Sequence, residues 1–275
     1  MKTLDEQQRQ RLLEGVDKIG QQVMVVYRRD FDVETKADNS PLTEADLLAN
    51  RLLTTLLQKV LPDTPVLSEE SKLASYDVRR HWTRYWLIDP IDGTKEFVKR
   101  SDEFTINVAL IENGVPIFGI VQAPALEQTW WGQTGIGAFK GSNGESHAIQ
   151  ARELPVPEQS PWKVVGSRSH GASAFETFCR GLPRHERVSM GSSLKLCLVA
   201  EGAADLYPRL APTCEWDTAA AHAVVLAAGG DVLDVSTLRP LRYNQKESLN
   251  NPFFIVCNGR NERWVKALEK ARSST

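Results

Sequence analysis

The sequence predicts a layered protein of the mixed α+β and α/β type, in which helices cover β-sheets. A β-meander supports this in the first part of the chain, where two β-rich runs at 104–110 and 115–121 flank the turn Glu112-Asn113-Gly114. In the second part, short apolar runs alternate with helical segments. The 275 residues, 41% hydrophobic and 25% charged, suit two fused lobes or one large layered domain.

Two helices are predicted before the meander. Apolar residues recur at helical spacing across residues 7–27, and the polar segment 32–41 that follows is predicted to be a loop. Thr43 precedes a second helical pattern that extends to Val60, and Thr43 with Asp46 resembles a capping box. Short strands and the rest of the meander are expected at 65–70, 86–88, 128–132 and 137–140.

The polar segment 141–159 is predicted to separate two lobes, because it contains Pro155 and Pro157 and few apolar residues. We therefore expect an N-terminal α+β lobe at residues 1–155 and a C-terminal α/β lobe at residues 156–275, fused into one unit. Strands of the second lobe are expected at 163–165, 204–207, 232–235 and 253–256. Its helices are expected at 171–181, 194–200, 215–228 and 261–271.

Charge and cysteine content exclude several classes of protein. The 33 basic and 35 acidic residues give a net charge of -2, without the basic excess of a protein that binds a nucleic acid polymer. The four cysteines form no CxxC pair and no metal-like spacing with the five histidines, so reduced thiols are expected. The charged start lacks the apolar core of a signal peptide, and no apolar run approaches the roughly 18 residues of a transmembrane segment. We expect a monomer or homodimer in the cytoplasm, either free or peripheral on the inner face of the cell membrane.

One turn stands at the centre of the chain. Three apolar residues, 86–88, precede Asp89-Pro90-Ile91-Asp92-Gly93-Thr94. Carboxylates suit Mg²⁺, and the fixed φ of proline makes the turn stiff enough to hold Asp89 and Asp92 toward one point, with the Ile91 carbonyl as a third oxygen. A helix that starts at Thr94 would add free N–H groups beside the metal. An ordinary surface turn of the Asp-Pro and Asp-Gly kind has the same composition.

Other carboxylates also lie where elements begin or end. Glu69 and Glu70 follow a predicted strand, Asp217 lies at a helix start, and Asp46 is in the first turn of another helix. Each has a structural alternative: glutamate pairs are often solvated, Asp217 suits an N-cap, and Asp46 complements a helix dipole. The functional interpretation requires these groups to converge in space.

Three of these stretches resemble the signatures of the inositol monophosphatase superfamily of metal-dependent, lithium-sensitive phosphatases, in the same order and at similar separations. They are Glu69-Glu70, Asp89-Pro90-Ile91-Asp92-Gly93-Thr94 and Glu215-Trp216-Asp217. The segment from Lys36 to Asp46 is similar to the first mobile loop of that family, although Asn39 replaces its usual glycine. The resemblance implies a layered αβαβα sandwich and hydrolysis of a phosphate ester by activated water.

A second set of stretches is similar to the bacterial CysQ-type bisphosphate nucleotidases within that superfamily. These stretches are residues 166–170, 191–202, and 204–209 leading into 215–218. The implied substrate is adenosine 3′,5′-bisphosphate, or its sulfated relative 3′-phosphoadenylyl sulfate, and the implied role is support of sulfate assimilation. The alternatives are an inositol or sugar-phosphate phosphatase of the same fold, and a non-catalytic metal-binding regulator.

The resemblance also implies roles for individual residues. Two or three Mg²⁺ ions are expected on Glu69, Asp89, the Ile91 carbonyl, Asp92 and Asp217. Thr94 is expected to orient the attacking water with Asp46 as proton acceptor, and Glu70 to assist a second water. Contacts with the substrate are expected from Glu69, Ile91, Asp92, Gly93, Thr94, Ser167, His170, Ser192, Lys195, Arg209 and Asp217. Structural alternatives are a surface loop for His170 and an ordinary solvated side chain for Lys195.

Overall fold

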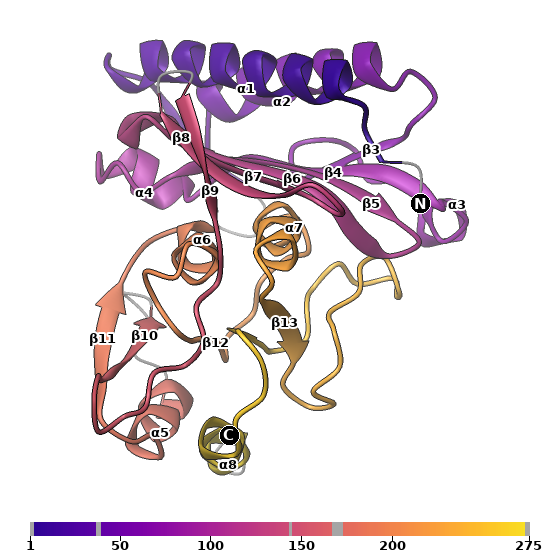
Figure 1. Cartoon of the computed structure of the whole chain (residues 1–275). Coiled ribbons are helices and arrows are strands. Elements are labelled where there is room, and N and C mark those ends of the chain that lie inside the picture. The colour runs from indigo at the N-terminus through magenta and orange to yellow at the C-terminus, as the bar shows by residue number, and fades with distance from the viewer. Residues whose placement is uncertain (1–2, 37–39, 143–144, 167–172, 273–275) are drawn as a thin grey trace.

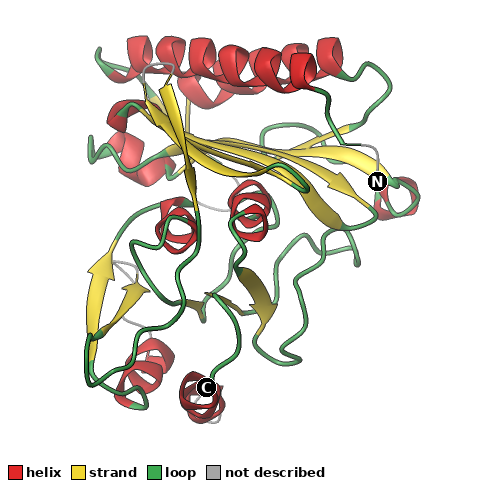
Figure 2. Ribbon diagram, in the orientation of Figure 1, coloured by secondary structure: helices red, strands yellow, loops and turns green. Residues whose placement is uncertain are grey.

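The secondary-structure elements stack in five layers that alternate between helices and sheets (Figure 1). The structure, a computed structural model, describes residues 3–36, 40–142, 145–166 and 173–272. The order helix, sheet, helix, sheet, helix is also visible when the chain is coloured by secondary structure (Figure 2). The predicted layered αβαβα arrangement is therefore confirmed.

The outer layer consists of α1 (Glu6–Tyr27) and α2 (Glu44–Val60), which lie side by side on one face of the large sheet (Figure 1). Each helix begins with a capping box, on Asp5 in α1 and on Thr43 with Asp46 in α2. The cap on α2 was predicted, and it fixes where the Asp46 side chain lies.

The large sheet has seven strands, in the order β3-β4-β5-β6-β7-β8-β9. Only its β3–β4 pair is parallel, and the other neighbours are antiparallel. The strands are β3 (Val66–Ser68), β4 (Arg84–Asp92), β5 (Thr105–Glu112), β6 (Val115–Ala123), β7 (Gln128–Gln133), β8 (Gly137–Ser142) and β9 (Glu145–Ile149). The predicted meander is confirmed. The segment 141–159, which was predicted to connect two lobes, contains the strand β9 as well.

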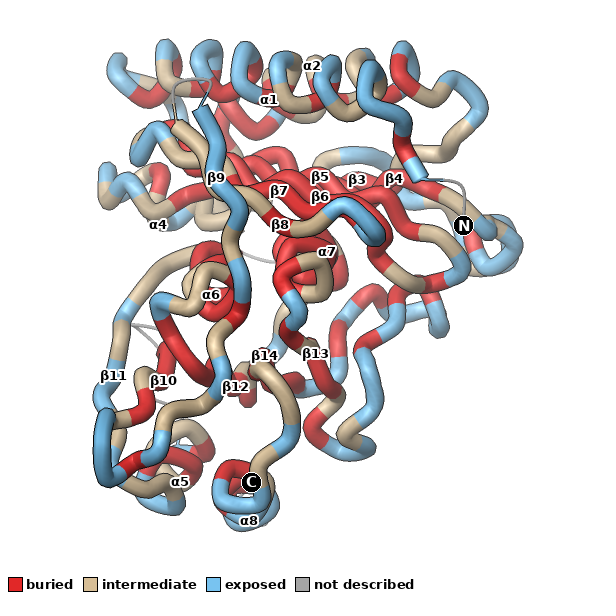
Figure 3. The backbone as a smooth tube through the Cα atoms, viewed as in Figure 1, coloured by how far each residue is buried: buried red, intermediate tan, exposed pale blue. Residues whose placement is uncertain are grey.

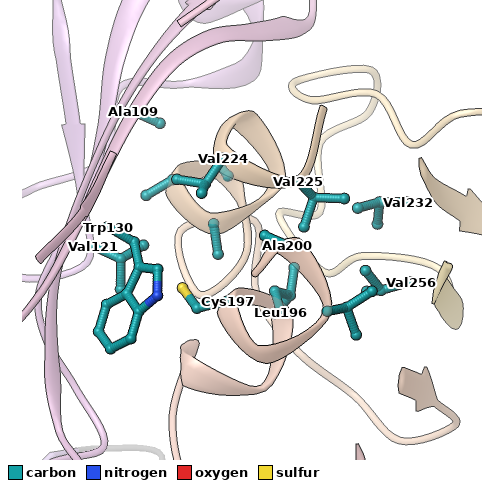
Figure 4. Close-up of a cluster of buried hydrophobic side chains, with 14 of the residues drawn as sticks. Ala109, Val121, Trp130, Leu196, Cys197, Ala200, Val224, Val225, Val232 and Val256 are labelled. Atoms are coloured by element: carbon teal, nitrogen blue, oxygen red, sulfur yellow. The ribbon is translucent and has the colours of Figure 1, made fainter. Parts of the chain in front are cut away.

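The central strands of this sheet are buried on both faces, whereas the edge strand β9 is mostly exposed (Figure 3). Along β4, Trp86 and Ile88 pack with the outer helices, whereas Tyr85 and Leu87 pack on the opposite side. This alternation follows from the two-residue repeat of a strand. The second face contacts the central helix layer, where Trp130 of β7 lies near Cys197 and Val224 of the helices (Figure 4).

The central helix layer and the two layers below it come from the second part of the chain. The central helices are α6 (Leu194–Ala200) and α7 (Ala219–Ala227). The strands below them form two small sheets, one of β10 (Trp162–Gly166) with β11 (His185–Ser189) and one in the order β12 (Tyr207–Arg209), β14 (Phe254–Cys257), β13 (Asp231–Asp234). The last layer contains α5 (Ser173–Arg180) and α8 (Glu262–Arg272).

Several predicted boundaries differ from the structure. The predicted loop at 32–41 contains part of a hairpin of β1 (Val33–Thr35) and β2 (Pro41–Thr43), and β11 was not predicted. The strand expected at 204–207 begins only at Tyr207, and the helix expected from 215 begins at Ala219. Three short elements complete the chain: α3 (Tyr76–Arg79), α4 (Thr94–Val98) and the 3₁₀ helix η1 (Pro124–Leu126).

The lobe boundary near residue 155 stays a prediction. One hydrophobic cluster draws side chains from both sides of that position, including Leu87 of β4 and Val225 of α7. The two parts therefore share a core. None of the helices in the described part of the chain has the length and apolar character needed to cross a membrane.

Candidate functional site

Three carboxylates from distant parts of the sequence converge beside the central helices. Glu69 follows β3, Asp89 lies near the end of β4, and Asp217 precedes α7. One oxygen from each lies within 4.8 Å of the others, and Asp89 is buried. All three were predicted as metal ligands, and the structure brings them together.

Burial of these like charges raises their pKa values. Burial raises the pKa of Asp89 well above its usual value, and the charges of Glu69, Asp92 and Asp217 add to the effect. Burial and the nearby Asp92 raise the pKa of Asp217 to about 8. A bound cation would relieve this repulsion, and an all-oxygen set of carboxylates is the donor chemistry of Mg²⁺. The residues present therefore fit the predicted metal.

The turn after β4 adds a backbone oxygen. The Asp89 carboxylate accepts a hydrogen bond from the Ile91 amide at 3.0 Å, which folds the chain back after Pro90. Gly93 has a φ of 90°, a left-handed conformation that glycine adopts without strain, and α4 begins at Thr94 as predicted. The Ile91 carbonyl lies 3.2 Å from the Thr94 hydroxyl, whose single proton can go either to this oxygen or to Asp46 at the same distance.

Asp46 connects the capping box of α2 to this turn. Its carboxylate is fully buried, accepts hydrogen bonds from the Thr43 amide at 2.8 Å and the Thr43 hydroxyl at 2.6 Å, and lies 3.2 Å from the Thr94 hydroxyl. Burial raises the pKa of Asp46. A buried carboxylate with a raised pKa beside a hydroxyl is a suitable proton acceptor.

Lys36 bridges the two neighbouring glutamates. Its ammonium lies 2.8 Å from Glu69 and also donates to Glu70. Burial lowers the pKa of Lys36, but the hydrogen bonds to the two carboxylates outweigh burial and raise it. Residues 37–39, including Asn39, lie outside the described part of the chain.

Asp92 lies beside the triad but is held by a different segment. Its Oδ2 atom accepts hydrogen bonds from the Ser192 hydroxyl at 2.5 Å and the Ser193 amide at 2.6 Å. The loop before α6 therefore contacts the metal-binding turn directly. Gly191 allows this approach, because a Cβ there would lie 2.9 Å from a carboxylate oxygen of Glu103.

Two cations lie near the same loop. Lys195 is buried in α6, its ammonium donates to the Ser192 carbonyl at 2.6 Å, and burial lowers its pKa to about 8 against the opposing effect of Asp92. Lys195 is therefore not a solvated surface lysine. The Arg209 guanidinium donates to the carbonyls of Ala211 and Pro212 at 3.1 and 2.8 Å. The predicted substrate contacts Ser167 and His170 lie outside the described residues.

Asp217 does not cap α7. The N-cap of that helix is Thr218, and the Asp217 carboxylate instead accepts a hydrogen bond from the Cys214 amide at 2.9 Å. Glu215, two residues earlier, is buried and accepts from the Asn244 amide at 2.9 Å. Burial raises the pKa of Glu215 to about 7.

Some neighbours of the site were not assigned a role from the sequence. Lys36 and Glu215 lie within stretches that resemble family motifs, so a signal was present. Thr105, Asn107 and Ser193 are buried near Asp92, and the only local signal for the first two is a polar residue at alternate positions of an apolar strand.

Comparison with known proteins places the chain among phosphatases. The sequence pattern of the Inositol monophosphatase family matches residues 6–272. The chain is 48% identical to the 3′(2′),5′-bisphosphate nucleotidase CysQ of Escherichia coli K12, over 86% of this chain and 94% of that protein. It is 35% identical to the protein of the same name from Haemophilus influenzae, over 96% and 97% of the two chains.

The fold has close counterparts among solved structures. The crystal structure of CysQ from Bacteroides thetaiotaomicron, described as a bacterial member of the inositol monophosphatase family, superposes with a TM-score of 0.80. The two sequences are 39% identical, and the match covers 92% of this chain and 97% of that one.

Proposed function

The chain belongs to the inositol monophosphatase family, and from this membership we propose that it is a Mg²⁺-dependent 3′(2′),5′-bisphosphate nucleotidase. Its substrate would be adenosine 3′,5′-bisphosphate, which it hydrolyses at the 3′-phosphate to AMP and phosphate. 3′-Phosphoadenylyl sulfate would be a related substrate, and removal of these compounds would support sulfate assimilation. The choice of substrate rests on the high identity to nucleotidases that carry this name.

The single observation that carries the hydrolytic activity is the convergence of Glu69, the buried Asp89 and Asp217 beside the Thr94–Asp46 pair. With the Ile91 carbonyl and Asp92, the triad would hold two or three Mg²⁺ ions. When bound, closely spaced cations stabilise the attacking and leaving oxygens of an in-line displacement at phosphorus.

The protein side chains would orient the reactants and transfer a proton. The Thr94 hydroxyl lies between the Asp46 carboxylate and the Ile91 carbonyl, so it can accept the proton of an attacking water while it passes its own to Asp46. No side chain caps α4, so its first N–H groups, with that of Gly93, can receive phosphate oxygens. Glu70, held by Lys36, would orient a second water.

The substrate would lie against the loop that precedes α6. This loop contacts Asp92 through Ser192, and it brings the buried Lys195 to the same region. A lysine ammonium and the Arg209 guanidinium suit the second phosphate of a bisphosphate, whereas an uncharged polyol would leave them without an anionic partner. The described cysteines are all free thiols, which fits a reducing cytoplasm.

Phosphate release tests the proposal. We expect Mg²⁺-dependent turnover of adenosine 3′,5′-bisphosphate that greatly exceeds turnover of inositol 1-phosphate, and loss of both on addition of a chelator. Faster turnover of the inositol ester would identify a polyol phosphatase. No turnover of either ester would identify a non-catalytic metal-binding protein.

A further inference from the structure

Three hydroxyls, of which those of Thr105 and Ser193 belong to buried residues, link β5 to the Asp92 carboxylate. The Ser193 hydroxyl lies 2.8 Å from Asn107 Oδ1 and 2.8 Å from the Thr105 hydroxyl. The Thr105 hydroxyl lies 2.6 Å from that of Ser192, which lies 2.5 Å from Asp92 Oδ2. These contacts form one continuous chain of side chains from the sheet to a predicted metal ligand.

A count of the available protons shows in which direction the groups of this hydrogen-bonded series donate. The series has four contacts of 2.8 Å or less, but its three hydroxyls supply only three protons. The fourth proton has to come from the Asn107 amide, whose Nδ2 atom has no hydrogen-bond partner among the described residues. A 180° flip of the Asn107 side-chain amide places Nδ2 where Oδ1 lies, 2.8 Å from the Ser193 hydroxyl. Each group then donates to the next, and the chain ends on the carboxylate, which can only accept.

The backbone conformation supports the same interpretation. Ser192 has a φ of 51°, in the left-handed region that is unfavourable for serine by roughly 1–2 kcal/mol. Such a conformation persists only where surrounding contacts fix it. Here the Ser192 hydroxyl and the Ser193 amide both donate to Asp92 Oδ2, and the Gly191 amide donates to Glu103 at 2.7 Å.

We propose that Asn107, Ser193, Thr105 and Ser192 form a positioning relay that fixes the Asp92 carboxylate for Mg²⁺. The relay binds Oδ2 through two donors, so the carboxylate is held in one orientation and Oδ1 remains for the cation. Each hydroxyl polarises the next, which strengthens the terminal bond in a buried environment. The Ser192 proton is committed to Asp92, so this hydroxyl acts through the metal ligand rather than by donating to the nucleotide. The inference deepens the proposed function and rests on it.

The test compares two substitutions at one position. Thr105→Val keeps the shape and removes the hydroxyl, whereas Thr105→Ser keeps the hydroxyl. Mg²⁺ binding is measured without substrate, from the Mg²⁺ concentration that gives half of the maximal thermal stabilisation. Groups that orient metal ligands typically change metal affinity 10- to 100-fold. We therefore expect Thr105→Val to raise this concentration at least about tenfold and Thr105→Ser to stay within about threefold of the wild type.

Two further variants complete the experiment. Ser193→Ala should weaken Mg²⁺ binding as Thr105→Val does, and it replaces Thr105→Val in the test if that variant does not fold. Thr55→Val is the matched control, because that hydroxyl bonds to the Arg51 carbonyl within α2, and its loss should leave Mg²⁺ binding unchanged. With saturating Mg²⁺, the KM for adenosine 3′,5′-bisphosphate should be unchanged in the relay variants.

The relay is wrong if folded Thr105→Val or Ser193→Ala binds Mg²⁺ as the wild type does, or if Thr105→Ser is as impaired as Thr105→Val. Failure of the proposed function is separate, because it appears as absent nucleotide turnover in the wild type. The Mg²⁺ titration contains no substrate and still reports on the relay in that case.

Discussion

Asp46→Asn should separate catalysis from stability. The carboxylate accepts from Thr43 through Oδ2 and faces the Thr94 hydroxyl through Oδ1. In the asparagine variant, the amide oxygen can retain both contacts with Thr43. The NH₂ group then faces Thr94 and donates to it, so the hydroxyl can no longer pass a proton in that direction.

The expected loss of catalytic rate in Asp46→Asn follows from the role of Asp46 as a proton acceptor. General-base assistance contributes roughly 10²- to 10⁴-fold to a rate, which corresponds to about 3–5 kcal/mol of transition-state stabilisation. The free energy of unfolding should change by no more than about 1 kcal/mol, since the bonds to Thr43 remain and a buried charge is removed. Mg²⁺-dependent phosphate release and urea unfolding measure the two quantities.

The matched control is Asp5→Asn, the same chemical change in the exposed capping box of α1, where the carboxylate accepts from the Gln8 amide at 2.8 Å. This variant should retain full activity. Thr94→Ala combined with Asp46→Asn should be little worse than either alone, because the two residues act as one unit. A folded Asp46→Asn enzyme with kcat within threefold of the wild type would refute the role of Asp46.

Three further predictions follow from other residues. Mg²⁺ affinity should rise by at least about tenfold per pH unit as the pH approaches 8, because burial and Asp92 raise the pKa of Asp217 to about 8 and its proton must leave before a cation binds. A thermal-shift titration that is flat from pH 6.5 to 8 would contradict this. Burial lowers the pKa of His222 to about 3, so below pH 6.5 this residue takes up a proton in the unfolded chain but not in the folded chain. Its own contribution to the free energy of unfolding should therefore fall by about 1.4 kcal/mol per unit as the pH drops toward 3. Urea unfolding of the wild type and of His222→Gln at pH 7 and pH 5 isolates this contribution: the wild type should lose stability relative to His222→Gln at the lower pH, because the carboxyl groups with raised pKa values act equally in both proteins. Gly119→Ala should destabilise the protein by about 3 kcal/mol, because its Cβ would lie 2.1 Å from the Ala220 carbonyl oxygen of α7; Gly15→Ala, which meets only the mobile end of Leu56, should have a much smaller effect on Tm.

Local periodicity predicted elements whose own residues carry the signal. α1 and α2 were predicted because their apolar residues repeat with helical spacing, and the meander because β-rich runs flank Asn113-Gly114. β11 and β9 were not predicted, since their exposed, polar sequences resemble connections and their pairing depends on a neighbouring strand. The strand expected at 204–207 was displaced to β12 for the same reason, because pairing with β14 decides where it begins.

The sequence by itself determined which chemical groups the central turn contains. Asp89, Asp92, Gly93 and Thr94 lie close together in the chain, so proline stiffness, glycine freedom and a helix start can be inferred from order alone. Resemblance added Glu69 and Asp217 and the class of reaction.

Tertiary structure decided how those groups are arranged, because convergence depends on the packing of distant elements. Only the stacked layers bring Asp217 from the start of α7 to Asp89 on β4, and they place Asp46 of α2 3.2 Å from the Thr94 hydroxyl, the pairing that the resemblance implied. The same packing turns Ser192 toward Asp92 through Thr105 of β5, a contact that no spacing in the sequence encodes. The physical reason is that a hydrogen bond between buried side chains forms only when its donor and acceptor are placed to within a few tenths of an ångström. That placement is set by the packing of the whole core rather than by neighbours along the chain.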